Sequence, residues 1–266
     1  MFDYIIIGAG SAGCVLANRL SEDAGVNVLL LEAGPRDWHP FIHMPAGVAK
    51  LVGQKGVNWD YDTAPEPHLN RRTLWWPRGK VLGGSSSINA MCYIRGVPAD
   101  YDSWPAQGAS GWDWRNVLPY FKRSEGNGRG ADDLHGGDGP LSVSDLRYTN
   151  PLSHAFVDAG AQAGYARNED FNGTQQEGVG FYQVTQRDGA RCSAAVAYLD
   201  PAKPRANLTV HTGALASRIT FDGAGSNRRA SGVTYSAYGK AFHQQATREV
   251  IVCGGAINSP QLLMLS

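Results

Sequence analysis

The sequence has no excess of either charge. Its 24 lysines and arginines are matched by 24 aspartates and glutamates, so the formal net charge at pH 7 is +0. A chain that binds nucleic acid or an anionic surface through its overall field needs a positive balance. We therefore expect no nucleic-acid partner.

Cysteine is also scarce. The four cysteines, Cys14, Cys92, Cys192 and Cys253, lie far apart in the sequence and form no CxxC pair. This spacing excludes a zinc ribbon and a dithiol redox motif. We expect free thiols, as in a reducing cytoplasm, and no metal site.

Long apolar runs and a basic leader are missing as well. No apolar run approaches the roughly 20 residues that a membrane span requires. The first residues, MFDYIIIG, carry an acid where a secretory signal carries a base. The sequence predicts a cytoplasmic protein without a transmembrane segment, with peripheral association on the inner face of the membrane left open.

The first 32 residues carry the pattern of a strand, a helix and a second strand. An apolar run at residues 4–7 precedes three glycines with GxGxxG spacing, and a helical pattern then extends to Leu20. A second apolar run at residues 26–31 is followed by Glu32. This order predicts a Rossmann-like βαβ unit that binds a dinucleotide.

Each key residue of this unit has a physical task. Gly8 permits the tight turn, Gly10 lets the backbone approach a pyrophosphate, and Gly13 lets the helix pack closely on the strand. The helix N-terminus presents free N–H groups and its positive dipole end to the phosphates. Glu32 can accept hydrogen bonds from both adenosine ribose hydroxyls and repels a 2′-phosphate, which disfavours NADP. FAD and NAD proteins share this unit, so the pattern leaves both cofactors open.

A second glycine-rich stretch lies at residues 75–96. Gly83 and Gly84 are followed by three serines, which leaves backbone with little side-chain bulk to lie against a flat or anionic ligand. A flexible linker is the alternative, because glycine and serine runs are typical of linkers. The flanking segments KVL and INAMCYI read as core, which favours the ligand-binding interpretation.

Two segments resemble the signature segments of the glucose–methanol–choline (GMC) oxidoreductases, which depend on FAD. They are GKVLGGSSSINAMCYIRGVPADYDSW at residues 79–104 and GGAINSPQLLMLS at residues 254–266. The likeness runs along the whole chain, through HGGDGPLSVS at 135–144 and DFNGTQQEGVGFYQVTQ at 170–186. Within the family the sequence is most similar to bacterial choline dehydrogenases and flavin-linked alcohol dehydrogenases.

The resemblance implies a set of cofactor contacts drawn from both glycine-rich stretches, from three positions between them and from two later positions. They are Gly8, Gly10, Ser11, Ala12, Gly13, Glu32, Ala33, Trp59, Arg78, Gly79, Val81, Gly83, Gly84, Ser85, Asn89, Ala90, Met91, Ala216 and Ala256. Asn89 and Ala90 are expected at the reactive edge of the flavin, Ala216 beside the adenine, and Ala256 beneath the cofactor. Ile88 stands where some relatives attach FAD through a histidine, so noncovalent FAD is expected.

The resemblance also implies a reaction. FAD-dependent oxidation of a primary alcohol to the aldehyde is expected, by hydride transfer to the flavin N5, with electrons passed to a quinone or another acceptor. The protein's share in such chemistry is orientation and electrostatics. Choline dehydrogenase is the first alternative. A non-catalytic FAD-binding fragment and an NAD-dependent dehydrogenase are the others.

No catalytic residue is assigned within residues 1–266. Family members use a histidine as the base, paired with a second histidine or an asparagine, in their C-terminal part. The seven histidines here occupy none of the family's positions, and isolated histidines are more often surface or satisfied polar groups. We expect a truncated chain, the N-terminal portion of a longer enzyme, and no turnover by these residues alone.

The expected fold is α/β. A Rossmann-like FAD-binding domain with a β-meander would be joined to part of an α+β substrate domain. The expected boundaries are 1–97 for the first part of the FAD-binding domain, 98–204 for a mixed segment, and 205–266 for the return to the FAD-binding domain. Within the mixed segment we expect helices near 114–123 and 152–164, and a surface loop at 125–139.

Overall fold

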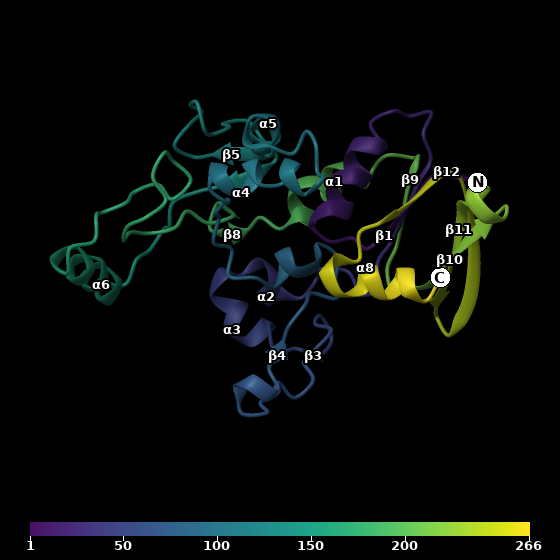
Figure 1. The fold of residues 1–266 in the computed structure, drawn as a ribbon, viewed down its shortest axis with the longest axis horizontal. Helices are drawn as coiled ribbons and strands as arrows, with labels where there is room; N and C mark the ends of the chain where they lie inside the picture. The colour runs from purple at the N-terminus through teal and green to yellow at the C-terminus, as the bar shows by residue number, and fades with distance from the viewer. The chain divides into compact units, whose positions relative to one another are not determined.

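The computed structural model describes residues 1–266 and divides them into two compact units (Figure 1). The first unit combines Met1–Ala90 with Ser193–Ser266, and the second comprises Met91–Cys192. The first unit is a mixed α/β fold, as the sequence predicted. The second is inserted between its two parts.

The boundaries differ from the expected 97/98 and 204/205 because of two short segments. Residues 193–204 carry a π-helix, Ala195–Leu199, which packs against the first helix of the chain and so belongs to the first unit. Residues 91–97 belong to the second unit, where the Tyr93 N–H donates to the Gln183 carbonyl at 2.9 Å.

A six-stranded sheet forms the centre of the first unit, in the order β10-β11-β12-β1-β2-β9. Strands β1 (Phe2–Ile7), β2 (Val28–Leu31) and β9 (Leu208–His211) run parallel. Ile5 lies opposite Leu29, and all four β2 residues are buried. Continuous apolar strands of this kind are typical of a parallel sheet covered on both faces.

The meander forms the other half of the sheet. It consists of β10 (Leu215–Asp222), β11 (Arg229–Ala237) and β12 (Lys240–Val252). Each of these strands pairs antiparallel with the next along the chain. The long β12 first pairs with β11 and then, from Ala246 to Val252, runs parallel to β1. The strands expected between residues 207 and 252 are all present.

Two helices cover the sheet. Helix α1 (Ser11–Leu20) follows the first glycine turn, and α8 (Gly255–Met264) follows the last strand. The C-terminal end of α1 is fastened to the π-helix, because the Asn18 side-chain amide donates to the Tyr198 carbonyl at 2.6 Å.

The remaining elements of the first unit are short. They are α2 (Pro40–His43), α3 (Val48–Leu51), β3 (Tyr61–Asp62), β4 (Trp75–Trp76), α7 (Asp200–Ala202) and four 3-10 turns at Pro45–Gly47, Pro67–Leu69, Gly84–Ser87 and Gly225–Asn227. A small second core holds together residues 40–88, called here the covering segment. Ile42, Leu51, Val57, Val81 and Ile88 are buried in it.

The second unit contains short strands and three helices. The strands pair as β5 (Glu125–Asn127) with β6 (Leu141–Val143), and β7 (Gln186–Arg187) with β8 (Ala190–Arg191). The helices are α4 (Pro98–Asp102), α5 (Trp114–Ser124) and α6 (Pro151–Gln162), with a 3-10 turn at Pro105–Gln107. Asp113 caps α5 and Asn150 caps α6, with Pro151 at the first helical position, so both expected helices begin at recognisable start signals.

The expected surface loop at 125–139 is only partly exposed. Residues 128–133 lie at the surface, but Glu125 is fully buried and His135 is 4% exposed. The expectation of a uniformly exposed loop is therefore wrong. Three polar side chains of this loop, Glu125, Asn127 and His135, are buried and hydrogen-bonded to one another, which composition does not reveal.

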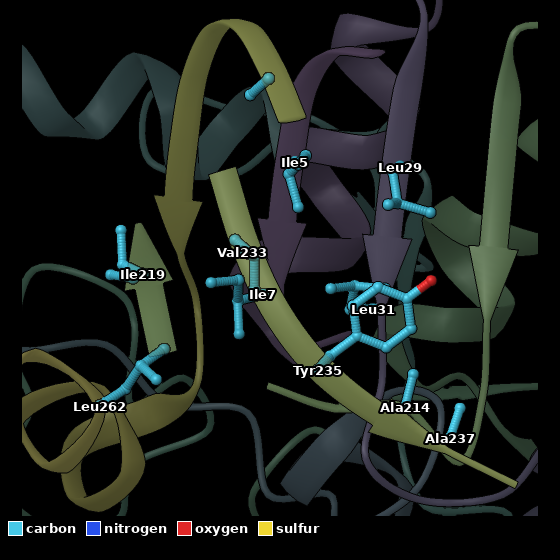
Figure 2. Close-up of a cluster of buried hydrophobic side chains, with 11 residues drawn as sticks. Ile5, Ile7, Leu29, Leu31, Ala214, Ile219, Val233, Tyr235, Ala237 and Leu262 are labelled. Atoms are coloured by element: carbon cyan, nitrogen blue, oxygen red, sulfur yellow. The ribbon is translucent and has the colours of Figure 1, made fainter. Parts of the chain in front are cut away.

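The main hydrophobic core lies between the parallel strands and the meander (Figure 2). Ile5, Ile7 and Leu31 from the parallel strands meet Val233 and Tyr235 of β11. Leu29 joins the same cluster and has 0% of its surface exposed. None of the helices is long and apolar enough to cross a membrane.

Replacement of Leu29 by alanine tests this core. Leu29→Ala is expected to lower the free energy of unfolding by about 2 to 5 kcal/mol, because it leaves a cavity in a closely packed cluster. Urea denaturation measures the change. The matched control is Leu215→Ala in β10, where the side chain is 45% exposed, and a shift within about 0.5 kcal/mol is expected. Equal losses in the two variants would contradict the position of the core.

Candidate cofactor site

The first glycine loop joins the end of β1 to the start of α1. Gly8 has φ +99°, and a Cβ there would lie 2.5 Å from the Cys253 carbonyl oxygen. A Cβ on Gly13 would lie 1.9 Å from the Gly8 carbonyl oxygen. The turn and the close packing of the helix therefore both require glycine, as the sequence predicted.

Gly10 is different, because nothing inside the chain requires it. Its backbone is extended, with φ −81° and ψ −161°, which any residue can adopt. A Cβ on Gly10 would meet only the Gly84 Cα, at 4.0 Å. The missing side chain leaves open space in front of the N-terminus of α1, where Gly10 itself supplies no side-chain cap. Such a space fits a ligand that approaches the backbone closely.

The second glycine stretch lies against the first. The Gly83 N–H donates to the Ala9 carbonyl at 2.7 Å, and a Cβ on Gly84 would lie 2.7 Å from the Gly10 Cα. Both glycines have positive φ, +88° and +55°. Residues 8–13 and 83–84 are therefore two walls of one cradle, although more than 70 positions separate them in the sequence.

Two further glycines let the covering segment reach this cradle. A Cβ on Gly34 would lie 1.9 Å from the Lys80 carbonyl oxygen, and a Cβ on Gly79 would lie 2.2 Å from the Gly84 carbonyl oxygen. The Ser85 hydroxyl accepts a hydrogen bond from the Gly79 N–H at 3.1 Å. The stretch at 75–96 is thus packed structure, which excludes the flexible-linker interpretation at residues 79–85.

Glu32 lies at the end of β2 and is 5% exposed. Its Oε2 accepts the Ala9 N–H at 2.9 Å and its Oε1 accepts the Gly34 N–H at 2.8 Å. Burial raises the pKa of Glu32, while the two backbone N–H groups and the charge of Lys80 act in the opposite direction. Each carboxylate oxygen can accept a second hydrogen bond, so ribose hydroxyls remain suitable additional donors.

Backbone hydrogen bonds bring the expected adenine segment to the same place. The Gly213 N–H donates to the Gly34 carbonyl at 2.9 Å, and the Ala214 N–H donates to the Glu32 carbonyl at 2.8 Å. Ala216 follows two residues later on β10. Ala33 is half-buried between these contacts.

An aromatic cluster lies beside the cradle. Trp59 and Tyr61 stack with ring centroids 5.8 Å apart, and the Lys80 Nζ lies 4.5 Å from the Trp59 ring centroid. The Arg78 N–H donates to the side chain of Asn58, and its guanidinium lies over the Trp76 ring at 4.8 Å.

Helix α8 is attached to this cluster, because the Tyr61 hydroxyl donates to the Asn258 Oδ1 at 2.5 Å. Ala256, which the sequence analysis expected beneath the cofactor, is the second residue of α8 and is exposed.

The other residues expected to contact the cofactor differ in how exposed they are and in the unit to which they belong. Ser11, Ala12 and Ser85 are exposed at the mouth of the cradle, and Val81 is buried in the second core. Asn89 and Ala90 are exposed at the end of the first unit. Met91 belongs to the second unit and is 4% exposed, with its carbonyl accepting the Thr185 N–H at 2.9 Å.

Three residues that hold the segments around the cradle were not predicted from the sequence. Asn58 is 2% exposed, and its side chain donates to the Val52 carbonyl and accepts the N–H groups of Asp60 and Arg78. Tyr61 and Asn258 are the others. The segment GGAINSP, which contains Asn258, was noted only for its family likeness, and no local pattern reveals a contact across nearly 200 residues.

The histidines fit the expectation of satisfied or surface groups. His43 contacts the Asp37 carbonyl at 2.7 Å, His211 contacts the Tyr235 hydroxyl at 3.3 Å, and His68 is exposed. No group of three or more metal-ligating side chains is present. A cavity of about 380 Å³ lies along α6 in the second unit, and none of the expected cofactor residues lines it.

Replacement of Gly84 by alanine tests the contact between the two glycine stretches. The new Cβ would meet the Gly10 Cα at 2.7 Å on a backbone with φ +55°. We expect the cofactor-free chain to lose about 1 to 3 kcal/mol of stability in urea denaturation. Gly53→Ala is the matched control, because its Cβ would meet nothing within 4 Å. A Gly84→Ala protein as stable as the control would show that the stretches do not touch.

Comparisons with known proteins agree with this arrangement. Residues 2–266 match the GMC oxidoreductase family. The chain is 54% identical to an alcohol dehydrogenase [acceptor] of Pseudomonas putida and 50% identical to the mitochondrial choline dehydrogenase of Homo sapiens. Both matches cover 100% of this chain, but only 48% and 45% of the two relatives. The chain thus spans about half the length of the curated relatives it matches.

Solved structures give the same result. The chain superimposes on pyridoxine 4-oxidase from Mesorbium loti with a TM-score of 0.93 at 37% identity, over 99% of this chain and 51% of that one. An FAD-dependent oxidoreductase from Chaetomium thermophilum gives a TM-score of 0.91 at 31% identity, over 100% of this chain and 47% of that one. The fold, the double glycine cradle and these matches together show that the chain belongs to the GMC oxidoreductase family.

Proposed function

We propose that this chain binds FAD without a covalent bond and forms the cofactor-binding part of an enzyme that oxidises a primary alcohol to the aldehyde. One observation carries the proposal. Two distant glycine stretches meet at Gly10 and Gly84, and Gly10 leaves an opening that the chain's own packing does not need. A pyrophosphate in that opening would meet the N-terminus of α1.

The residues of the first unit have separate tasks in this proposal. The backbone of Gly10, Ser11 and Ala12 binds the pyrophosphate, and Glu32 accepts the ribose hydroxyls. Ala216 offers backbone groups to the adenine. When bound, the flavin supplies a hydride acceptor for the alcohol carbon. The chain binds and orients that cofactor, with Asn89 and Ala90 near its reactive edge.

We expect no covalent bond between the chain and FAD because of the residue at position 88, where some family members attach the cofactor. Ile88 occupies it and is 3% exposed, packed in the second core with Val81 and Leu51. An aliphatic side chain there cannot form a bond to the flavin. The proposal therefore includes a cofactor that leaves the protein on denaturation.

The alcohol substrate and the electron acceptor belong to the same proposal. The name of the Pseudomonas putida relative supports an acceptor other than NAD, and a quinone is the acceptor we propose. Delivery of electrons to a membrane quinone would bring the protein to the inner face of the membrane as a peripheral protein. Choline is the second candidate substrate, favoured by the 50% identity to the human choline dehydrogenase. Within residues 1–266 we assign no catalytic base.

Replacement of Gly10 by valine tests the cofactor site. Gly10→Val is expected to weaken FAD binding by more than about tenfold, because the side chain fills the opening for the pyrophosphate. The cofactor-free protein should lose about 1 kcal/mol, because valine caps a helix N-terminus less well than glycine, while the new Cβ meets no atom of the chain closer than 4.0 Å. Flavin fluorescence titration and urea denaturation measure the two quantities.

The control for this test is Gly53→Val, which fills open surface space and should bind FAD as the unmodified chain does. A parallel thermal-shift titration compares FAD with NAD. Stabilisation by NAD and not by FAD, or normal FAD retention by Gly10→Val, would overturn the proposed cofactor site.

A second test concerns the reaction. The FAD-loaded 266-residue chain, mixed without oxygen with a primary alcohol or with choline, is expected to keep an oxidised flavin spectrum, because no base is assigned among its residues. Absorbance of the flavin near its visible maximum is the measurement. Bleaching by either substrate would show that a group within residues 1–266 can act as the base, and would identify the substrate that is used.

A further inference from the structure

The second unit contains a group of four ionisable side chains, three of them buried, that the cofactor site does not use. Arg95, Glu125 and His135 are 6%, 0% and 4% exposed, and the side chain of Asp170 is 35% exposed. They come from four separate segments. Three of these segments, at 79–104, 135–144 and 170–186, carry the motifs noted for their family likeness.

Glu125 lies at the centre of this charged cluster, at the start of β5. Its Oε2 accepts hydrogen bonds from the Arg95 guanidinium at 2.5 Å and from the Gly136 N–H at 3.0 Å. Its Oε1 lies 3.0 Å from the His135 Nδ1. A fully buried carboxylate with this many donors is stable only while those donors remain in place.

His135 lies between two carboxylates. Its Nδ1 faces Glu125 and its Nε2 faces the Asp170 Oδ2, both at 3.0 Å. A neutral imidazole has one N–H, so one ring nitrogen would then turn a lone pair toward a carboxylate oxygen. Both contacts are hydrogen bonds only when both ring nitrogens are protonated.

The neighbouring Asn127 does not supply the missing proton. Its Oδ1 accepts the Arg129 N–H at 2.9 Å, which fixes the orientation of the amide. Its NH2 group then donates to the Glu125 Oε1 and to the Gln183 Oε1, both at 3.0 Å. The same amide nitrogen also lies 3.2 Å from the His135 Nδ1, but its two hydrogens are taken by the two closer oxygen acceptors.

The charges around His135 also favour the imidazolium, in which both ring nitrogens are protonated. Glu125, Asp170 and Asp132 face it. The Asp132 Oδ1 accepts a hydrogen bond from the backbone N–H of His135 at 2.7 Å. The cations nearby are Arg95, which is paired with Glu125, and Lys122, whose Nζ donates to the Asp132 carbonyl. A protonated His135 makes the charges of Arg95, Glu125, Asp170 and His135 sum to zero.

The charged cluster lies where three parts of the chain meet. The Arg95 Nη1 donates to the Leu134 carbonyl at 2.6 Å, and the Arg95 N–H donates to the side chain of Asn172 at 2.7 Å. Residues 91–96, 125–136 and 168–172 are therefore connected through it. Loss of the His135 charge would leave the Glu125 and Asp170 carboxylates without a shared partner.

We propose that His135 is held as an imidazolium between Glu125 and Asp170, and that this charged cluster is a pH-sensitive lock on the fold of residues 91–192. The lock is closed while His135 is protonated and opens when His135 loses its proton. Burial alone lowers the pKa of His135, but hydrogen bonds and charges from Glu125 and Asp170 outweigh it, so the pKa is raised.

The direction of the pH dependence follows from this raised pKa. A histidine with a higher pKa in the folded than in the unfolded chain stabilises the fold fully below the unfolded value, about 6.5. That stabilisation is lost as the pH rises through the folded pKa of His135. The second unit should therefore weaken toward alkaline pH.

Nitrogen NMR of the purified chain, labelled with ¹⁵N in its histidines, tests the lock. Both ring nitrogens of His135 are expected to be protonated at pH 6.5, and to titrate at a higher pH than those of exposed His68 in the same sample. Asp170→Asn keeps an oxygen acceptor and removes one charge, so it should lower the pH at which His135 titrates. A His135 that is neutral at pH 6.5, or that titrates with or below His68, would overturn the proposal.

Urea denaturation between pH 6 and 9 gives an independent readout. The urea midpoint of the unmodified chain should fall as the pH rises through the His135 titration, and that fall should be absent in His135→Gln. His154→Gln, a change at an exposed histidine of the same unit, should keep the fall. Parallel pH profiles for the unmodified chain and His135→Gln would contradict the lock, and if His135→Gln does not fold, the NMR titration decides alone.

Discussion

The peptide groups on either side of Ala9 are held by two parts of the chain that are distant in sequence. The Ala9 N–H donates to the Glu32 carboxylate at 2.9 Å, and the Ala9 carbonyl accepts the Gly83 N–H at 2.7 Å. Ala9 has 0% of its surface exposed, so neither bond is weakened by water. This pair of hydrogen bonds fixes the glycine loop after β1 between the end of β2 and the second glycine stretch, and the rest of the candidate site is built on it.

Several otherwise separate features follow from this constraint. Gly84 must lack a side chain because the Gly83–Ala9 bond brings its Cα against Gly10, and Gly34 must lack one because Lys80 passes over it. Glu32 is buried because it supports the loop, and each of its carboxylate oxygens can accept one more hydrogen bond. If the same carboxylate also binds ribose, as proposed, the stability of the loop and the function of the site depend on one side chain. Within this cradle only Gly10 has a Cβ position that stays open.

Much of this could be predicted from the sequence, and the limits have physical causes. The βαβ unit, the meander and the roles of Gly8 and Gly13 follow from local periodicity and turn chemistry, which one sequence contains. The meeting of residues 8–13 with residues 83–84 was inferred from a family resemblance, since no local pattern encodes it. The positions of Asn58, Tyr61 and the His135 cluster depend on contacts between distant segments. For that reason the loop at 125–139 was expected to be exposed, and the boundaries of the second unit differ from those predicted.

The two units therefore rely on different physical interactions. The first uses small residues and backbone hydrogen bonds to keep an opening for a dinucleotide, and the second uses a charge-balanced polar cluster to hold irregular segments together. Amide hydrogen exchange with and without FAD tests the central claim, that both glycine stretches bind one cofactor, most directly. The account predicts that FAD slows exchange in residues 8–13 and in residues 83–87 together, at the same FAD concentration. Protection of one stretch without the other would contradict it.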